Sequence, residues 1–376
     1  MNHKIAILTL PLHHNFGGNL QVYALSETLK DLGHQVIVLN IQNKKLTNVA
    51  IIKNFGKNIL KKIFLSKSIN FVVLESEKKK LYKNHTQFLR EKLNLTEEIT
   101  DLSGLEAMVN FHKFDAVVVG SDQVWRKAYT PNIQTYFLNF VKDKSIKKIA
   151  YGASFGLEKW QYDRETTLDL AKLAEDFDYI SVRESDAVDL CKNYLHIDSE
   201  HVLDPTLLLG KEKYLDLIKG FESKSKNKLF TYILDKDLYK NDWINKISAD
   251  KNLPVTEIEL FKNKNIPLIH EIDKIVTPHV ETWLANFRDA EFVITDSFHG
   301  MVFSIIFNKE FLVFVNNERG ASRFYSLLKF LNLEDRIINN KSFNLSSLKK
   351  IDYEKTSSLI SEKVFQIKNK LARVFK

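Results

Sequence analysis

A carboxylate, a hydroxyl and an imidazole lie close together in the segment 296–300, as Asp296, Ser297 and His299. They follow the short apolar run 292–294, which is too brief for a helix and predicts a buried strand. Asp296 or Ser297 can cap the helix that follows, which puts His299 in its first turn. In α/β folds, anionic ligands bind where a strand ends and a helix begins with free backbone N–H groups. The plainer alternative is a capped helix whose histidine is satisfied by a neighbour.

Two further predicted strands also end in charged side chains. Asp122 comes just after the apolar run 114–120, and Arg183 ends the strand predicted at 178–183. Taken alone, Asp122 fits a cap and Arg183 fits an ion pair at the start of a helix. Together with His299 they could face one cleft, because the carboxyl ends of parallel strands meet at one edge of a sheet. An arginine beside a helix N-terminus would suit a phosphate or a carboxylate.

The sequence offers little support for a cofactor or a metal. The glycine turn at 13–19 resembles a phosphate-binding loop but lacks the spacing G-x-G-x-x-G. Asn40 stands where a dinucleotide site needs an acidic residue, which disfavours NAD and FAD and leaves a smaller ligand open. No P-loop, no Cys/His zinc spacing and no nucleophile elbow is present. We therefore expect no cofactor and no bound metal.

Composition points to a soluble enzyme or binding protein with two domains. The 376 residues suggest two domains, and 44% hydrophobic with 27% charged residues is typical of globular proteins. The single cysteine, Cys191, excludes an internal disulfide and fits a reducing compartment. The sequence has no signal-type segment and no apolar run of membrane-spanning length, so we expect a cytoplasmic protein.

The net charge of +8 favours anionic partners and is concentrated in one stretch. The segment 41–70 holds seven lysines and no acidic residue, with apolar residues at helical spacing between them. Such a basic amphipathic helix can lie on an anionic membrane. The family resemblance described below implies the inner face of the membrane. The alternative is a surface helix packed on its own domain. No nucleic-acid-binding motif accompanies the charge, so nucleic acid is not expected as a partner.

Strands alternate with helical patterns in both halves, which predicts two doubly wound, Rossmann-like α/β domains facing a cleft. The strand 4–10, the helix ending at Gly33 and the strand 35–40 form one βαβ unit, so the sheet should be parallel. We place an N-terminal domain at 1–210, a linker at 211–228, a C-terminal domain at 229–350, and at 351–376 a helix that could pack back on the N-terminal domain. The family resemblance described below implies that the N-terminal domain is the acceptor side and the C-terminal domain the donor side.

The same polar segments resemble the landmarks of the polysaccharide pyruvyl transferase family. The most specific are GSDQVW and TDSFHG, and the order and spacing of the whole set cover about residues 5–335. In chain order the landmarks are 15–21 (NFGGNLQ) with 23–25 (YAL), 115–125 (DAVVVGSDQVW), 181–184 (SVRE), 203–205 (LDP), 295–300 (TDSFHG) and Arg323.

The resemblance implies a fold similar to the two-domain glycosyltransferase-B architecture. The implied activity moves pyruvate from phosphoenolpyruvate, the donor substrate, onto two hydroxyls of a sugar, releasing phosphate, in cell-surface polysaccharide biosynthesis. The acceptor in this family is often a sugar or oligosaccharide on a lipid carrier. Family members bind the donor with arginines and with an Arg-Leu-His sequence, which Arg183 and His299 match in part. Ser297 and Phe298 replace Arg-Leu here, so Arg323 or Arg319 would have to supply the missing charge.

Ketal formation needs a proton donor near neutral pH, and histidine suits that task. We expect His299 to be the acid or a phosphate contact, with Asp296 orienting it. Arg183 would hold the phosphate or carboxylate, and Asp122 would engage the acceptor or act as base. The remaining residues expected to bind substrate are Ser297, Phe298, Gly300, Arg323, Asn15, Gly18, Asn19, Gln21, Ser121 and Gln123.

Two other functions are compatible with the sequence. A glycosyltransferase using a nucleotide-sugar donor could occupy the same fold, because a fold does not fix its chemistry. A non-catalytic scaffold protein of the polysaccharide assembly machinery is the third alternative. A pyruvyl transferase releases phosphate from phosphoenolpyruvate, whereas a glycosyltransferase of this kind releases a nucleoside diphosphate. The released product therefore separates these two functions.

Overall fold

The computed structural model describes residues 2–12, 14–42, 79–258, 276–316, 320–338 and 343–376. Nearly all of the basic segment 41–70, which was expected to form an amphipathic helix, lies outside the described residues. Arg319, a candidate for the missing charge, lies outside them too.

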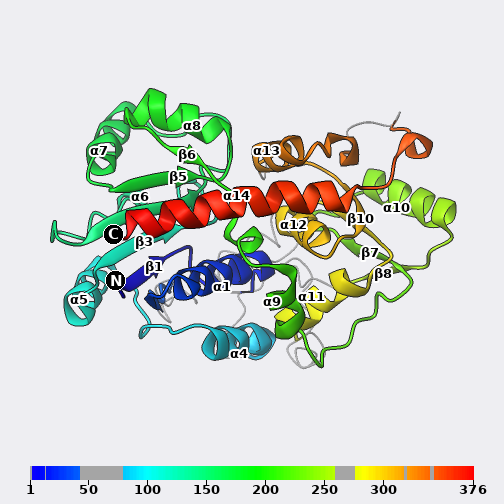
Figure 1. The fold of residues 1–376 in the computed structure, drawn as a ribbon, viewed down its shortest axis with the longest axis horizontal. Coiled ribbons are helices and arrows are strands. Elements are labelled where there is room, and N and C mark those ends of the chain that lie inside the picture. The colour runs from blue at the N-terminus through cyan, green and yellow to red at the C-terminus, as the bar shows by residue number, and fades with distance from the viewer. Residues whose placement is uncertain (1, 13, 43–78, 259–275, 317–319, 339–342) are drawn as a thin grey trace, which may run out of the picture.

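The N-terminal half forms one six-stranded parallel sheet in the order β2-β1-β3-β4-β5-β6 (Figure 1). Its central strands are nearly continuous runs of Val, Ile and Ala, as expected for a parallel sheet buried on both faces. The strands are β1 (Lys4–Leu8), β2 (Gln35–Val38), β3 (Ala116–Gly120), β4 (Lys147–Ala153), β5 (Tyr179–Val182) and β6 (Glu200–His201). The helices are α1 (Phe16–Asp31), α4 (Lys83–Lys92), α5 (Leu102–His112), α6 (Ile133–Tyr136), α7 (Arg164–Ala174) and α8 (Asp186–Leu190).

The C-terminal half forms a second parallel sheet, with four strands in the order β10-β9-β7-β8. Its strands are β7 (Leu229–Tyr232), β8 (Val255–Glu257), β9 (Phe292–Thr295) and β10 (Glu310–Val313). Its helices are α10 (Leu238–Lys251), α11 (Val280–Asp289), α12 (Phe298–Ile306) and α13 (Ser322–Leu331). The predicted fold class, two α/β domains with Rossmann-like parallel sheets, is confirmed.

The segment 211–228, expected to be a linker, is partly helical and packed. Its first residues form α9 (Lys211–Leu217), in which Tyr214 is fully buried and donates its hydroxyl to the carbonyl of Thr206 at 2.8 Å. The Tyr214 ring also meets Phe303 of α12 edge-on, with 5.1 Å between ring centroids. Tyr214 thus docks α9 against both halves.

The long helix α14 (Tyr353–Val374) runs along both halves of the molecule (Figure 1). Near its start, the backbone N–H of Ile351 donates to Glu310 in the C-terminal domain at 2.8 Å. At its end, Lys147 of the N-terminal domain donates to the carbonyl of Val374 at 2.7 Å. The ring centroids of Phe375 and His34 are 4.7 Å apart. The helix therefore contacts both domains directly.

The two domains also share one hydrophobic core. Phe16 of α1 stacks on Trp283 of α11 with 5.2 Å between ring centroids, and both side chains are buried. Residues of β1, α1, α11 and α12 belong to the same continuous apolar cluster. No helix in the described part of the chain is long and apolar enough to cross a membrane.

Candidate active site

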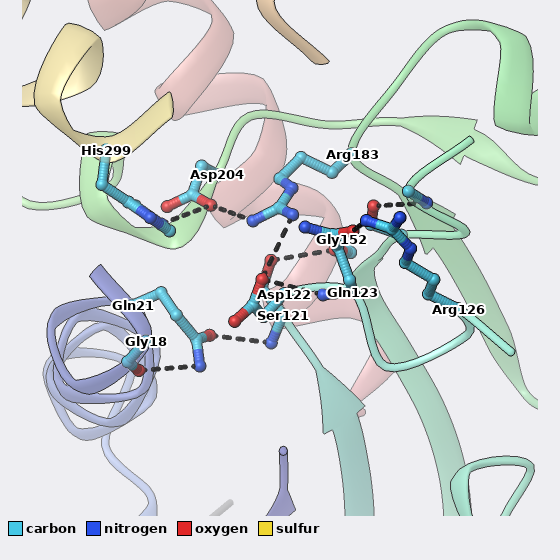
Figure 2. Close-up of polar contacts among 12 residues, drawn as sticks. Gly18, Gln21, Ser121, Asp122, Gln123, Arg126, Gly152, Arg183, Asp204 and His299 are labelled. Carbon is cyan, nitrogen blue, oxygen red and sulfur yellow. Dashed lines mark hydrogen bonds and ion pairs between the residues drawn. The ribbon is translucent and has the colours of Figure 1, made fainter. Parts of the chain in front are cut away.

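A chain of charged side chains connects the two domains where the carboxyl ends of their strands face each other (Figure 2). His299 Nε2 lies 3.5 Å from Asp204 Oδ2, and Arg183 donates to the same Asp204 oxygen at 2.9 Å. The other terminal nitrogen of Arg183 lies 3.5 Å from Asp122 Oδ1. The predicted strand ends after β3, β5 and β9 therefore meet at one place, and Asp204 joins them.

His299 is placed by the sharp turn that joins β9 to α12. Ser297 caps α12 by accepting a hydrogen bond from the backbone N–H of Gly300 at 3.3 Å. The imidazole is 7% exposed and lies directly against the first turn of α1, because a methyl group built on Gly17 would fall 2.0 Å from its Nδ1. Gly300 is needed in the same way, since a methyl group there would fall 2.4 Å from Thr295 Oγ1.

Asp204 is the carboxylate that faces His299, and the sequence alone did not identify it. It is 2% exposed and accepts hydrogen bonds from Thr206 N at 3.0 Å and Thr206 Oγ1 at 2.6 Å. Burial raises the pKa of Asp204, but the charges of His299 and Arg183 and the Thr206 hydrogen bond outweigh it, and the pKa ends well below its usual range. Asp204 is therefore an ionised carboxylate beside the imidazole.

Asp296 does not orient His299, contrary to the expectation from their closeness in sequence. Its carboxylate accepts backbone hydrogen bonds from Leu234 at 2.6 Å and Asp235 at 3.0 Å, just beyond β7. Lys240 of α10 pairs with the same carboxylate at 2.8 Å. The loop after β7 and the buried Lys240 thus occupy both oxygens of Asp296, which makes it a structural residue of the C-terminal domain.

Arg183 is held between carboxylates at the end of β5. Its side chain is 1% exposed, with Asp204 and Asp122 on its two terminal nitrogens. Burial lowers the pKa of Arg183, but the negative charges of Asp204, Asp122 and Glu184 outweigh this and raise it overall. Its guanidinium also lies over the ring of Phe298, 5.0 Å from the ring centroid.

Arg323 also lies over the ring of Phe298. Its guanidinium is 5.2 Å from the centroid of Phe298, and burial followed by the charge of Arg183 lowers its pKa to about 10. A small pocket opens here, and it is lined by Arg183, His201, Val202, Leu203, Asp204, Phe298, Arg323, Leu327 and Phe330. The two arginines named from the sequence therefore border one pocket together with the turn residue Phe298.

Ser121 and Gln21 use their polar atoms inside the protein. Gln21 accepts from the backbone N–H of Ser121 at 3.0 Å and donates to Thr9 at 3.0 Å and to the carbonyl of Gly18 at 3.1 Å (Figure 2). The Ser121 hydroxyl donates to the carbonyl of Gly152 at 2.9 Å. Both were expected to bind substrate, but the structure uses them to fix the loop that carries Asp122.

The remaining predicted residues fall into two groups around this centre. Gln123 is buried and accepts a hydrogen bond from Arg126 at 2.7 Å. On the side of α1, Asn15 caps the helix by accepting from the N–H of Gly18 at 3.1 Å. Asn19 contacts His85 at 3.0 Å, a buried histidine whose pKa burial lowers to about 3. Asn15 and Asn19 thus shape the start of α1, and the backbone N–H of Gln123 donates to Asp122 at 2.9 Å.

Glu184 is a second buried carboxylate that the sequence named only as a neighbour of Arg183. It accepts from the Ser154 hydroxyl at 2.6 Å and from the N–H of Gly156 at 3.2 Å. Burial raises its pKa, which the charge of Arg183 partly opposes. Within the described residues, no group of three or more His, Cys, Asp or Glu side chains is arranged to hold a metal ion.

Comparison with known proteins identifies one family and several solved structures of low sequence identity. The family model described as polysaccharide pyruvyl transferase matches residues 15–318 of this chain. Among solved structures, an O-GlcNAc transferase mutant from Thermobaculum terrenum has a TM-score of 0.49 and 9% identity, over 100% of this chain and 68% of that one. An alpha-glucosyltransferase in complex with UDP has a TM-score of 0.46 and 12% identity, over 100% and 95% of the two chains. No curated protein matches the sequence.

Proposed function

The chain belongs to the polysaccharide pyruvyl transferase family, and on that premise we propose that it transfers pyruvate from phosphoenolpyruvate to two hydroxyls of a sugar, forming a cyclic ketal. Membership makes it a transferase of polysaccharide biosynthesis. The observation that carries the proposal is the group of His299, Asp204 and Arg183, which brings an imidazole, an ionised carboxylate and a guanidinium together beside a pocket between the domains.

In the proposed reaction, a proton is added to the methylene carbon of phosphoenolpyruvate, which becomes the methyl group of the product. The neighbouring carbon then gains cationic character, and one sugar hydroxyl attacks it. The second hydroxyl displaces phosphate and closes the ketal. One of the two hydroxyl protons balances the proton placed on carbon, and the other leaves with phosphate.

We assign the proton transfer to His299, because imidazole can both give and take a proton near neutral pH. Asp204 orients the ring and stabilises the positive charge that the imidazole carries, as a buried carboxylate does in other acid–base pairs. Arg183 and Arg323 bind the negative charges of the donor. Asp122, at the end of β3, lies on the acceptor side and can receive the proton of a sugar hydroxyl.

The test is incubation of the purified protein with phosphoenolpyruvate and candidate lipid-linked sugars. We expect phosphate to be released and the mass of the acceptor to increase by one pyruvyl ketal. Release of a nucleoside diphosphate from a nucleotide sugar, with no consumption of phosphoenolpyruvate, would replace this proposal with a glycosyltransferase.

We also propose that the enzyme works at an anionic membrane surface. The support is the segment 41–70, with seven lysines and no acidic residue, together with the lipid-linked acceptor expected for the family. Flotation with liposomes that contain anionic lipid should carry the protein upward, and replacing Lys53, Lys57 and Lys61 by Gln should reduce this. Equal flotation of the two proteins, or none with anionic lipid, would rule the proposal out.

A further inference from the structure

Phe298 is the only residue of the described chain whose ring lies within cation–π range of two arginines of the pocket. The guanidinium carbons of Arg183 and Arg323 are 5.0 Å and 5.2 Å from its ring centroid. The ring is 3% exposed and is fixed edge-on against Phe324, with 5.7 Å between centroids. Its position is therefore set by packing as well as by the two cations.

Two guanidinium groups near one another repel, and the protein has to offset that repulsion. Asp204 and Asp122 pair with Arg183. Burial is the largest cause that lowers the pKa of Arg323, and the positive charge of Arg183 lowers it further. The face of an aromatic ring carries partial negative charge and attracts both cations at these distances. Phe298 thus supplies an attraction shared by the two groups without adding a formal negative charge to the pocket.

This arrangement matters for a ligand because all three side chains line the same pocket. A phosphate group can accept hydrogen bonds from two guanidinium groups at once, provided that both are already in place. Holding them in place before binding lowers the entropy lost when the ligand arrives. Asp204 and Asp122 already pair with the two terminal nitrogens of Arg183, and Asp204 lines the pocket. A further carboxylate at position 298 would add to the negative charge that a phosphate meets there, whereas an aromatic ring holds the arginines without it.

We propose that Phe298 is a positioning residue that holds Arg183 and Arg323 ready to bind one phosphate group of the ligand. This inference rests on the proposed function, in which that group is the phosphate of phosphoenolpyruvate. Phe298 acts through the two arginines, and its ring takes no part in the chemistry.

The test compares Phe298→Leu with Phe298→Tyr, using inorganic phosphate as the probe and isothermal titration calorimetry of the full chain. Leucine keeps an apolar side chain and removes the ring, so phosphate binding should weaken about tenfold, the loss expected from two modest cation–π contacts. Tyrosine keeps the ring and should stay within about threefold of the wild type. In turnover assays, Phe298→Leu should raise the KM for phosphoenolpyruvate far more than it lowers kcat.

Phe303→Leu is the matched control, because Phe303 is a fully buried ring of the same helix that packs on Trp283 and Tyr214. It should lose at least as much thermal stability as Phe298→Leu and still bind phosphate like the wild type. Wild-type phosphate affinity in Phe298→Leu, equal weakening in Phe298→Tyr, or equal weakening in Phe303→Leu would each overturn the inference.

The inference and the proposed function can fail separately. A wild-type protein that binds phosphate in a Phe298-dependent way but does not consume phosphoenolpyruvate refutes the proposed donor and supports the phosphate subsite. A wild-type protein that consumes phosphoenolpyruvate without a Phe298-dependent phosphate site refutes the inference alone.

Discussion

His299 and Asp204 come from different domains, and their 3.5 Å approach is the closest charged contact of the candidate acid with any described carboxylate. Asp204 is anchored by Thr206 and Arg183, so it forms a fixed partner for the imidazole. Asp296 lies three residues before His299 in sequence, yet it is held by Lys240 and two backbone N–H groups. Variants of Asp204 and Asp296 therefore compare a carboxylate at the site with a carboxylate that only supports the fold.

Asp204→Asn should lower kcat by about a hundredfold or more, the usual size of an acid–base contribution, while His299→Ala should abolish turnover with the fold intact. Asp296→Asn should instead lower the free energy of unfolding by about 3 kcal/mol, because the buried Lys240 loses its closest charge partner and keeps only the half-exposed Asp237 at 3.8 Å. Steady-state kinetics and urea unfolding of the three variants distinguish these effects. A near-normal rate in His299→Ala, or a larger kcat loss in Asp296→Asn than in Asp204→Asn, would contradict the assignment.

The pH dependence of stability offers a second test of Asp204. Its pKa is lowered in the folded protein, so the ionised group stabilises the fold fully above the ordinary aspartate pKa of about 4. That contribution is lost progressively as the pH falls toward the folded-state value. The gap in unfolding free energy between wild type and Asp204→Asn should therefore be largest near pH 7 and shrink below about pH 4. Urea unfolding of both proteins near pH 7 and below about pH 4 measures this difference in unfolding free energy. A difference that stays constant or widens toward acid pH would count against an ionised Asp204.

At the scale of elements, the first turn of α1 and the first turn of α12 are packed so closely that one glycine decides the fit. Gly17 has no side chain, and the His299 ring fills the space that a methyl group would need. At Gly18, the next residue, a methyl group would meet only ordinary contacts with Asn15 at 3.4 Å or more. The two adjacent glycines thus separate a steric effect from the effect of alanine on a helix.

Gly17→Ala should destabilise the protein by about 1–3 kcal/mol through overpacking and displace His299, which lowers turnover. Gly18→Ala should be neutral or slightly stabilising, since alanine favours a helix over glycine by about 1 kcal/mol. In a His299→Ala background the overcrowding is gone, so Gly17→Ala should cost little stability there. Equal costs of Gly17→Ala in both backgrounds, measured by urea unfolding, would show that the two turns do not touch in solution.

The elements could be predicted from the sequence where apolar runs are short and bounded, as at 292–294 and 114–120, and the polar residues at their ends followed from those boundaries. Asp204 belongs to the family landmark 203–205 but was given no role, because an aspartate before Pro205 also fits a cap, and it does cap the turn Pro205–Leu207. Its contacts with Arg183 and His299 join residues that are distant in sequence, and no local pattern encodes them. Asp296 was misassigned for the opposite reason, since closeness in sequence says nothing about which way a side chain points after a strand.

At the scale of the whole molecule, the site exists only where the two domains meet. Gly17, Asp204 and Arg183 lie in the N-terminal half, whereas Phe298, His299 and Arg323 lie in the C-terminal half. The shared core around Phe16 and Trp283 holds the halves together near the site. Helix α14 adds a second connection away from that core, from Glu310 at its start to His34 and Lys147 at its end (Figure 1).

Phe375→Ala should release the end of α14 from the N-terminal domain. Phe375 is 2% exposed and packs on His34, so its truncation should lower the free energy of unfolding by about 3 kcal/mol, as for other buried phenylalanines. Because the domains are then tied at fewer points, the KM for the donor should rise, while the chemical groups of the site remain unchanged. Urea unfolding and steady-state kinetics measure the two effects.

Phe365→Ala is the matched control on the same helix, since that side chain is 68% exposed and should change stability by less than about 0.5 kcal/mol. Hydrogen exchange adds a local measurement, because amides in the last turns of α14 should exchange faster in Phe375→Ala and at the wild-type rate in Phe365→Ala. If both variants behave like the wild type, α14 does not hold the domains together in solution. If Phe375→Ala loses stability but keeps its KM, the helix stabilises the N-terminal domain without setting how the domains meet at His299 and Asp204.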